Sequence, residues 1–156
     1  MLFGLPCIPA TVQATRAVIY QAESAQINPG RAEVVAQASF KDGRGAALKA
    51  GLVAAHPLDN VPPDLVFTVN EPTAGRFVLK TFTAVDAAGA EMMRRANSKH
   101  ASLFADVQIG SQRPTRRVIF VPWSAPESCT QVLGIFDLTH GAQAIKVWLP
   151  PHVRLD

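Results

Sequence analysis

Apolar and polar residues alternate with a period of two through most of this 156-residue chain, between short segments rich in Pro, Gly and Asp. Such alternation places successive side chains on opposite faces of a strand, whereas a helix needs a period of 3.6. Nine strands are too many for one open sheet of ordinary size, so we expect an all-β, two-sheet antiparallel β-sandwich. The predicted strands are residues 17–22, 32–38, 45–50, 64–70, 76–85, 102–109, 115–121, 130–138 and 142–149.

Two connections between these strands are longer than a hairpin requires. Residues 54–63 are rich in proline, and about sixteen residues, 86–101, join two predicted strands. Within the second connection, residues 87–96 are good helix formers and Asp86 is a suitable N-cap, which predicts one short helix. Long connections in a compact domain are often functional.

The composition is that of a folded domain, with 48% hydrophobic and 17% charged residues. At this length a single domain is expected, because two would each have a thin core. We expect it to span residues 17–156. The preceding residues 1–16 are apolar but lack a basic start and contain Pro6 and Pro9. They are therefore expected to be a linker, an N-terminal arm or the end of a preceding domain rather than a signal peptide.

Charge and hydropathy argue against two classes of partner. The net charge of +3 is small for a dedicated nucleic-acid binder. No apolar run approaches the roughly 20 residues that cross a bilayer. We therefore expect neither nucleic acid nor membrane as a partner.

The two cysteines, Cys7 and Cys129, lack the spacing of a redox or zinc motif, which leaves either one disulfide or two ordinary thiols.

Three segments occur in an informative order. The first is Tyr20-Gln21-Ala22-Glu23-Ser24; the second, residues 65–79, has two strands around a Glu-Pro-Thr-Ala-Gly turn; the third, residues 138–147, is followed by a final strand at residues 153–156. In this order, residues 20–156 resemble carbohydrate-binding module families six and thirty-five. The resemblance implies a galactose-binding-like jelly roll of the kind attached to many polysaccharide-degrading enzymes.

The same resemblance implies a structural calcium ion where the first and last strands meet. Its ligands would be Gln21, Glu23 and Asp156, with backbone carbonyls of a neighbouring loop. Calcium binds six to eight oxygen ligands, which such a set supplies. On a strand, alternation would also put Gln21 and Glu23 on one face. The alternative is that these are ordinary polar residues of an edge strand.

The aromatic residues suggest where a sugar would bind. Phe67, Phe77 and Phe120 occupy strand positions expected in the core. Trp123 follows a predicted strand in a Pro-Trp-Ser loop and is the best platform for a sugar ring, although a tryptophan packed over the sandwich rim is the alternative. Trp148 is expected to point outward, onto a solvated sheet face or against a partner domain.

Arginines near the same loops could bind an acidic sugar such as a uronate, because guanidinium groups bind carboxylates bidentately. Relatives often carry Asn where this chain has Arg154. Arg113, Arg116 and Arg117 are further donors, and solvated surface arginines are the alternative reading. The candidate carbohydrate-binding residues are Trp123, Arg94, Arg95, His152 and Arg154.

The sequence contains none of the familiar catalytic motifs. The four histidines lack metal-ligand spacing, and neither a nucleophile elbow nor a phosphate-binding loop is present. We therefore predict a non-catalytic carbohydrate-binding module, an accessory domain of an extracellular or periplasmic polysaccharide-active enzyme. Its expected partners are a polysaccharide or oligosaccharide and an adjoining catalytic domain. One alternative is a structural sandwich domain that packs on a catalytic partner without binding sugar; a small hydrolase with dispersed carboxylates is another.

Overall fold

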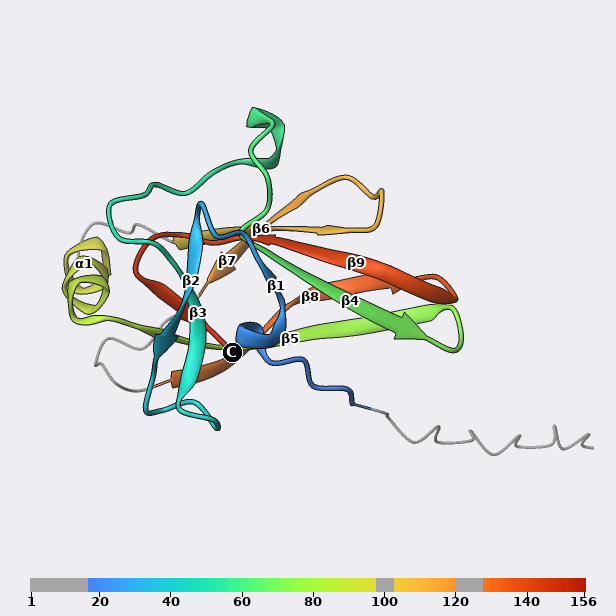
Figure 1. Ribbon diagram of the computed structural model, residues 1–156, viewed down its shortest axis with the longest axis horizontal. Coiled ribbons are helices and arrows are strands. Elements are labelled where there is room, and N and C mark those ends of the chain that lie inside the picture. The colour runs from blue at the N-terminus through green and yellow to red at the C-terminus, as the bar shows by residue number, and fades with distance from the viewer. Residues whose placement is uncertain (1–16, 98–102, 120–127) are drawn as a thin grey trace, which may run out of the picture.

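Two five-stranded antiparallel sheets form the molecule in the computed structural model, which describes residues 17–97, 103–119 and 128–156 (Figure 1). The first sheet has the strand order β1 (Gln26–Ile27), β4 (Leu65–Glu71), β9 (Gly141–Trp148), β6 (Leu103–Ile109) and β7 (Thr115–Ile119). The second has the order β2 (Ala32–Ala36), β3 (Arg44–Leu48), β10 (Val153–Leu155), β5 (Gly75–Val85) and β8 (Ser128–Leu138). The predicted two-sheet sandwich is confirmed.

The core lies between the sheets and follows the alternation of the sequence. On β10, Val153 and Leu155 are buried while Arg154 between them is not, and Leu65 and Val69 are the buried apolar positions of β4 on the opposite sheet. Burying a side chain of this size contributes about 1.5–3 kcal/mol. Phe67 and Phe77 pack against this core as predicted, and Phe120 lies outside the described residues.

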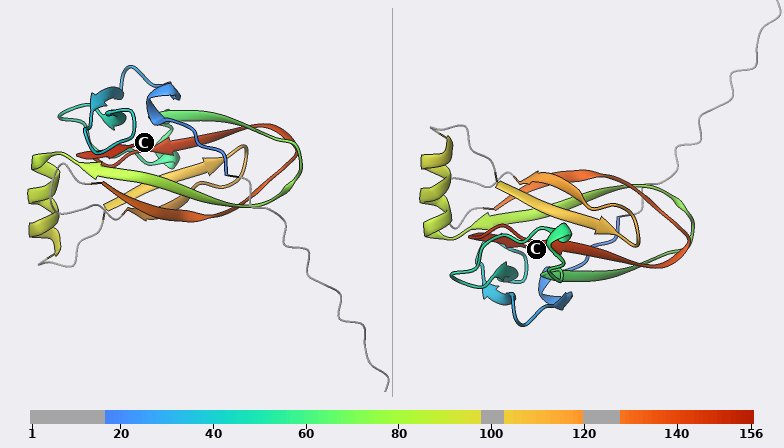
Figure 2. Two further views of the ribbon diagram at one scale, coloured as in Figure 1. Left: turned by 90° about the horizontal axis from the view of Figure 1, so that it is seen from below. Right: turned by 90° about the horizontal axis from the view of Figure 1, so that it is seen from above.

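A short helix, α1 (Ala87–Asn97), is present where the sequence predicted it. Asp86 caps it, because Asp86 Oδ1 accepts a hydrogen bond from the Gly89 backbone N–H at 2.7 Å. The helix lies at one end of the sandwich, and the β4–β5 and β8–β9 hairpins lie at the opposite end (Figure 2). No helix of the described residues is long and apolar enough to span a membrane.

The strand predicted over residues 17–22 is wrong. Residues 17–21 have no strand partner, Ala22–Ser24 form a 3-10 turn, and pairing begins only at Gln26. The reason is local: the Ser24 backbone N–H and hydroxyl both donate to the Gln21 carbonyl, at 3.1 and 2.7 Å. A serine that bonds the backbone in this way competes with an extended ladder.

The prediction that Trp148 points to solvent or to a partner domain is also wrong. Trp148 does point away from the core between the sheets, but it is only 4% exposed. Its Nε1–H donates to the Val61 carbonyl at 2.9 Å, so the proline-rich residues 54–63 form a covering segment over this part of the outer face. The chain therefore provides its own cover for the tryptophan.

A fully buried carboxylate, that of Asp64, holds this covering segment at its base. Its Oδ1 accepts from Arg31 Nε at 2.6 Å and its Oδ2 from the Leu149 backbone N–H at 2.7 Å. Arg31 Nη2 also donates to the Val53 carbonyl at 3.2 Å. One side chain thus joins the residue before β2, the residue after β9 and the end of the covering segment.

We expect Asp64→Ala to lower the free energy of unfolding by about 3–5 kcal/mol, because it leaves the largely buried Arg31 guanidinium without its carboxylate. Urea unfolding followed by tryptophan fluorescence would measure the change. Asp137→Ala is the control, since the Arg76–Asp137 pair is 76% and 77% exposed and such pairs contribute about 0–1 kcal/mol. Equal losses in the two variants would contradict the role assigned to Asp64.

Candidate functional site

The two ends of α1 have different surroundings. At its start, His152 Nδ1 lies 3.2 Å from Asp86 Oδ2, and the Asp86 backbone N–H donates to the His152 carbonyl at 3.3 Å. Gly89 packs directly on this contact, because a Cβ there would lie 2.8 Å from the His152 Cβ. The contact docks the helix on the turn before β10, so His152 has a structural role at this position.

Arg94 and Arg95 lie in the last turn of α1, and both pair with Glu91 of the same helix. The Nη2 of Arg94 is 2.7 Å and the Nε of Arg95 is 2.8 Å from the Glu91 carboxylate. The hydrogen bond from Arg95, followed by the charge of Arg94, lowers the pKa of Glu91. The Arg94 and Arg95 side chains are 59% and 77% exposed, so the two guanidinium groups still face solvent.

Arg154 belongs to a different part of the surface. Its Nη1 donates to the Ala36 carbonyl at 2.8 Å and to Gln37 Oε1 at 2.7 Å, across the neighbouring strand β3. The structure therefore does not gather Arg94, Arg95, His152 and Arg154 around one point. Trp123, the predicted platform, lies outside the described residues.

The remaining candidate arginines also have different neighbours. Arg117 points between the sheets, where its guanidinium lies 5.1 Å from the centre of the Phe136 ring and beside Gly134, at a β-bulge of β8. A side chain at position 134 would displace it. Arg113 is exposed in the β6–β7 turn.

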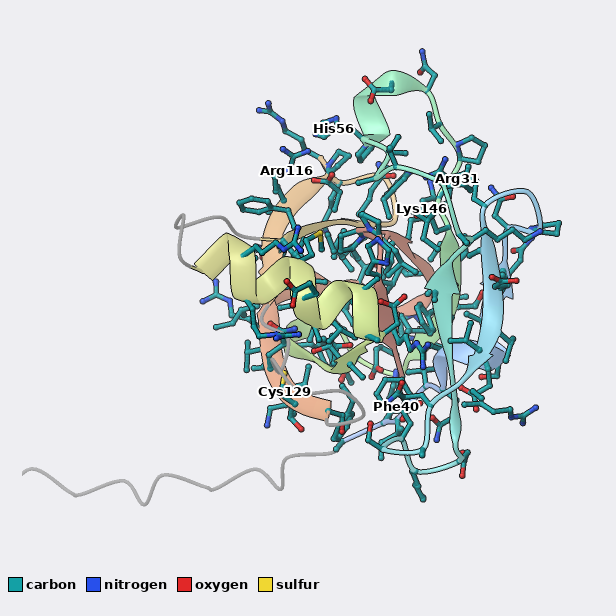
Figure 3. All side chains as sticks on the ribbon, turned by 90° about the vertical axis from the view of Figure 1, so that its left-hand side faces the viewer. Arg31, Phe40, His56, Arg116, Cys129 and Lys146 are labelled. Atoms are coloured by element: carbon teal, nitrogen blue, oxygen red, sulfur yellow. The ribbon has the colours of Figure 1, made fainter. Side chains whose placement is uncertain are left out.

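Sequence reasoning missed a charged cluster on the outer face of the first sheet. Asp106 is buried, Arg116 lies 3.4 Å from it on the paired strand β7, and His56 Nε2 of the covering segment is 3.9 Å away. Figure 3 shows His56 and Arg116 on the same side of the molecule. Because His56 is 50 residues from Asp106 in the chain, no local pattern signals the contact.

The two carboxylates expected at the calcium site are close enough to influence each other. Glu23 lies in the 3-10 turn and Asp156 directly follows β10. Both have a buried oxygen, Oε2 of Glu23 and Oδ1 of Asp156, that accepts no hydrogen bond. Burial, then the charge of Glu23, then that of Asp42, raises the pKa of Asp156. Unpartnered buried carboxylate oxygens of like charge favour a bound cation or a proton.

A closed loop lies beside these carboxylates. Residues 37–43 form it through the Gln37 N–H to Gly43 carbonyl bond at 2.8 Å, and Arg154 ties its start to β10. The buried Phe40 ring anchors the loop by packing directly on Gly45. A Cβ on residue 45 would lie 2.5 Å from this ring. The charges of Lys41 and Asp42 both act on Asp156, so the loop backbone is near the carboxylates.

Gln21 and Glu23 are not on a strand, so the prediction that alternation puts them on one face is wrong. Within the described residues, no three histidine, cysteine, aspartate or glutamate side chains gather as a metal site. An ion held by Glu23 and Asp156 would therefore need the Gln21 amide and backbone carbonyls as further ligands. Such a mixed oxygen set is compatible with calcium.

Comparison with known proteins identifies the fold. The sequence matches no protein-family model, and no curated protein matches it. A family 35 carbohydrate binding module from Clostridium thermocellum matches with a TM-score of 0.64 and 16% identity, over 89% of this chain and 92% of that chain. The predicted resemblance to family 35 is thus confirmed at the level of the fold.

Two longer proteins also contain a similar unit. One is the Podospora anserina GH26-CBM35 β-(1,4)-mannanase, with a TM-score of 0.60 and 13% identity. The other is a Paenibacillus cycloisomaltooligosaccharide glucanotransferase, with a TM-score of 0.62 and 14% identity. Each match covers 88% of this chain, which spans only 25% and 17% of the respective enzymes. At these identities the likeness shows the fold alone.

We expect Arg154→Ala to lower the free energy of unfolding by about 1–3 kcal/mol, because the Ala36 carbonyl and the buried Gln37 side chain lose a charged donor. Arg94→Ala is the control, with a change below about 1 kcal/mol because its ion pair is exposed. Chemical denaturation would compare them. Unchanged stability of Arg154→Ala together with lost sugar binding would instead make Arg154 a ligand-binding residue.

Proposed function

We propose that this chain is a non-catalytic carbohydrate-binding module, the accessory domain of a polysaccharide-active enzyme. The observation that carries the proposal is the match to nearly the full length of a family 35 carbohydrate binding module. The presence of the same fold as a minor part of two glycan-active enzymes supports the accessory role. Such an enzyme would act outside the cytoplasm, in the extracellular space or the periplasm.

The glycan would bind at the loop end of the sandwich that carries α1. Trp123 would provide the apolar platform, and the exposed guanidinium groups of Arg94 and Arg95 would favour a carboxylate-bearing sugar such as a uronate. The Glu91 carboxylate neutralises part of this charge, so a neutral sugar is the competing ligand at this end. His152 and Arg154 would act mainly through the helix and the loop that they hold.

Affinity electrophoresis with calcium would test the binding function against galactomannan, β-1,3-galactan, dextran and polygalacturonate. We expect retardation on at least one polysaccharide and its loss in Trp123→Ala, since stacking on an aromatic platform is a large share of sugar affinity. Arg113→Ala, which changes an exposed residue of the distant β6–β7 turn, should bind normally. Absence of retardation on the whole panel would reject the function, and product release from any polysaccharide would reject its non-catalytic character.

We also propose that calcium binds between Glu23 and Asp156. The buried, unpartnered carboxylate oxygens and the raised pKa of Asp156 support this site. Gln21 and the backbone of residues 37–43 would complete the oxygen ligands. When bound, the ion would neutralise the repulsion between the carboxylates and connect the start of the domain to its end.

Asp156→Asn should have opposite effects with and without calcium. In EDTA it should raise the melting temperature near neutral pH, because it removes a carboxylate that the fold disfavours in its charged form. With calcium at about 100 times its dissociation constant, the unmodified protein should gain about 2.7 kcal/mol, or roughly 5–10 °C, and the variant should lose this gain. Asp137→Asn is the control and should keep the gain, as its carboxylate is exposed elsewhere.

The pH dependence has a definite sign in the metal-free protein. Because folding raises the pKa of Asp156, the folded state holds this proton more tightly than the unfolded chain. The Asp156 contribution to stability is therefore complete below about pH 4 and decreases as the pH rises through the elevated pKa. Calcium should remove most of this decrease. Melting curves that do not respond to calcium at any pH would reject the metal site.

A second candidate function is packing on a catalytic partner. Four apolar side chains of the β5–β8 outer face, on paired or adjacent positions, are between 46% and 59% exposed. They are Val78, Phe82, Val132 and Ile135. A cluster of exposed apolar side chains on one sheet face is typical of an interaction surface. The absence of sugar binding in every assay above would leave this as the main role.

A further inference from the structure

A shallow groove of about 210 Å³ lies at the free edge of the first sheet, away from α1. One wall comes from residues 20–26 and includes Tyr20 and Ser24. The other wall is β4, with Phe67 and Thr68. Small-molecule pockets usually enclose about 300–1,000 Å³. The groove therefore fits one ring of a longer ligand that lies across the surface, rather than a whole enclosed molecule.

Two aromatic rings line this groove. Tyr20 is 38% exposed, while Phe67 is half-buried and held by the core behind it. Aromatic faces attract the polarised C–H groups of a sugar ring, and a ring fixed by its neighbours binds with little loss of side-chain entropy. Phe67 thus provides apolar contact surface that is already in place, and Tyr20 adds a ring from the opposite wall.

The polar groups of the groove are available to a ligand. The side chains of Tyr20, Gln26 and Thr68 make no hydrogen bond to any other described residue. The Ser24 hydroxyl donates to the Gln21 carbonyl at 2.7 Å and retains its capacity to accept. A phenol, an amide and hydroxyls match the donors and acceptors of sugar hydroxyls. None of the lining side chains is charged, which disfavours an acidic ligand.

The edge of β4 adds backbone groups. Strand β9 pairs with all of β4 from Leu65 to Glu71, whereas β1 pairs on the other side only at Leu65 and Val66. Beyond Val66, β4 has no strand on its β1 side within the described part of the chain. Alternate N–H and C=O groups of β4 therefore face outward along the groove, as at any unpaired sheet edge.

We propose that this groove binds one neutral pyranose unit of a glycan chain, as a subsite separate from the loops around α1. Tyr20 and Phe67 contact the ring, and Gln26, Thr68 and the edge of β4 hydrogen-bond its hydroxyls. The subsite rests on the proposed carbohydrate-binding function, and it specifies where a neutral sugar binds.

In affinity electrophoresis, Tyr20→Ala in the full chain should weaken binding about tenfold to the neutral polysaccharide that retards the unmodified chain. Tyr20→Phe, which keeps the ring and removes the hydroxyl, should weaken it only about two- to threefold. Thr68→Val, nearly isosteric and on a strand, should also cause a loss of about two- to fivefold, and it keeps the test valid if Tyr20→Ala misfolds. Phe82→Ala, which removes an exposed aromatic ring of the other sheet, should bind normally.

The outcomes separate the subsite from the function. If a polysaccharide retards the unmodified chain, Tyr20→Ala and Thr68→Val equally, the subsite is overturned and the function stands. Retardation on polygalacturonate alone would overturn the neutral ligand. Absence of retardation on every polysaccharide would overturn both. NMR gives a second measurement. Adding an oligosaccharide of the bound polysaccharide should shift the backbone amide signals of β4 in the unmodified chain, and it should not shift them in Tyr20→Ala.

Discussion

The buried carboxylate of Asp64 is the interaction on which the arrangement of this sandwich most depends. Hydrophobic burial between two sheets is not directional, so it does not by itself fix how connecting segments lie. Asp64 is directional: one oxygen binds Arg31, the other binds the Leu149 backbone N–H, and its own backbone bonds to Val147 and Asn28. A buried charge with these partners is costly to move, because any displacement leaves it unpaired.

The position of Asp64 decides which surfaces are accessible. The segment between β3 and β4 starts beside Arg31, which also binds the Val53 carbonyl, and it ends at Asp64. Held at both points, it covers Trp148 and brings His56 to Asp106. Part of the outer face of the first sheet is consequently interior. The α1 end, the carboxylate pair, the free edge of β4 and the outer face of β5 and β8 stay accessible.

Alternation in the sequence was sufficient to predict most strands, because most of them turn one face to the core. On the predicted strand β7, Arg116 and Val118 are exposed, whereas Arg117 and Ile119 are half-buried and buried. The pattern failed at Trp148 because periodicity distinguishes the two faces of a strand and does not see a segment, 87 residues earlier, that covers one of them. It failed at residues 17–22 because two hydrogen bonds of Ser24 outweighed a weak strand preference.

The candidate site was harder to predict for the same reason. The positions of Glu23 and Asp156 came from the order of three segments in a family resemblance, and their proximity depends on contacts across the whole chain. Arg154 carries no sign in the sequence that its partners are Ala36 and Gln37, 118 and 117 positions earlier. A residue type indicates what a side chain can bind, whereas its partners are set by the topology that brings β10 beside β3.

The turn that carries Glu23 also forms part of the groove at the edge of β4, through Ser24 and the nearby Tyr20. Tyr20 precedes the turn without a strand partner of its own, so its position depends on how firmly the turn is held. A cation between Glu23 and Asp156 would fix the turn against the end of β10 and reduce the entropy that Tyr20 loses when a sugar binds. A metal and a glycan at these two places would therefore bind with positive coupling, although neither would touch the other.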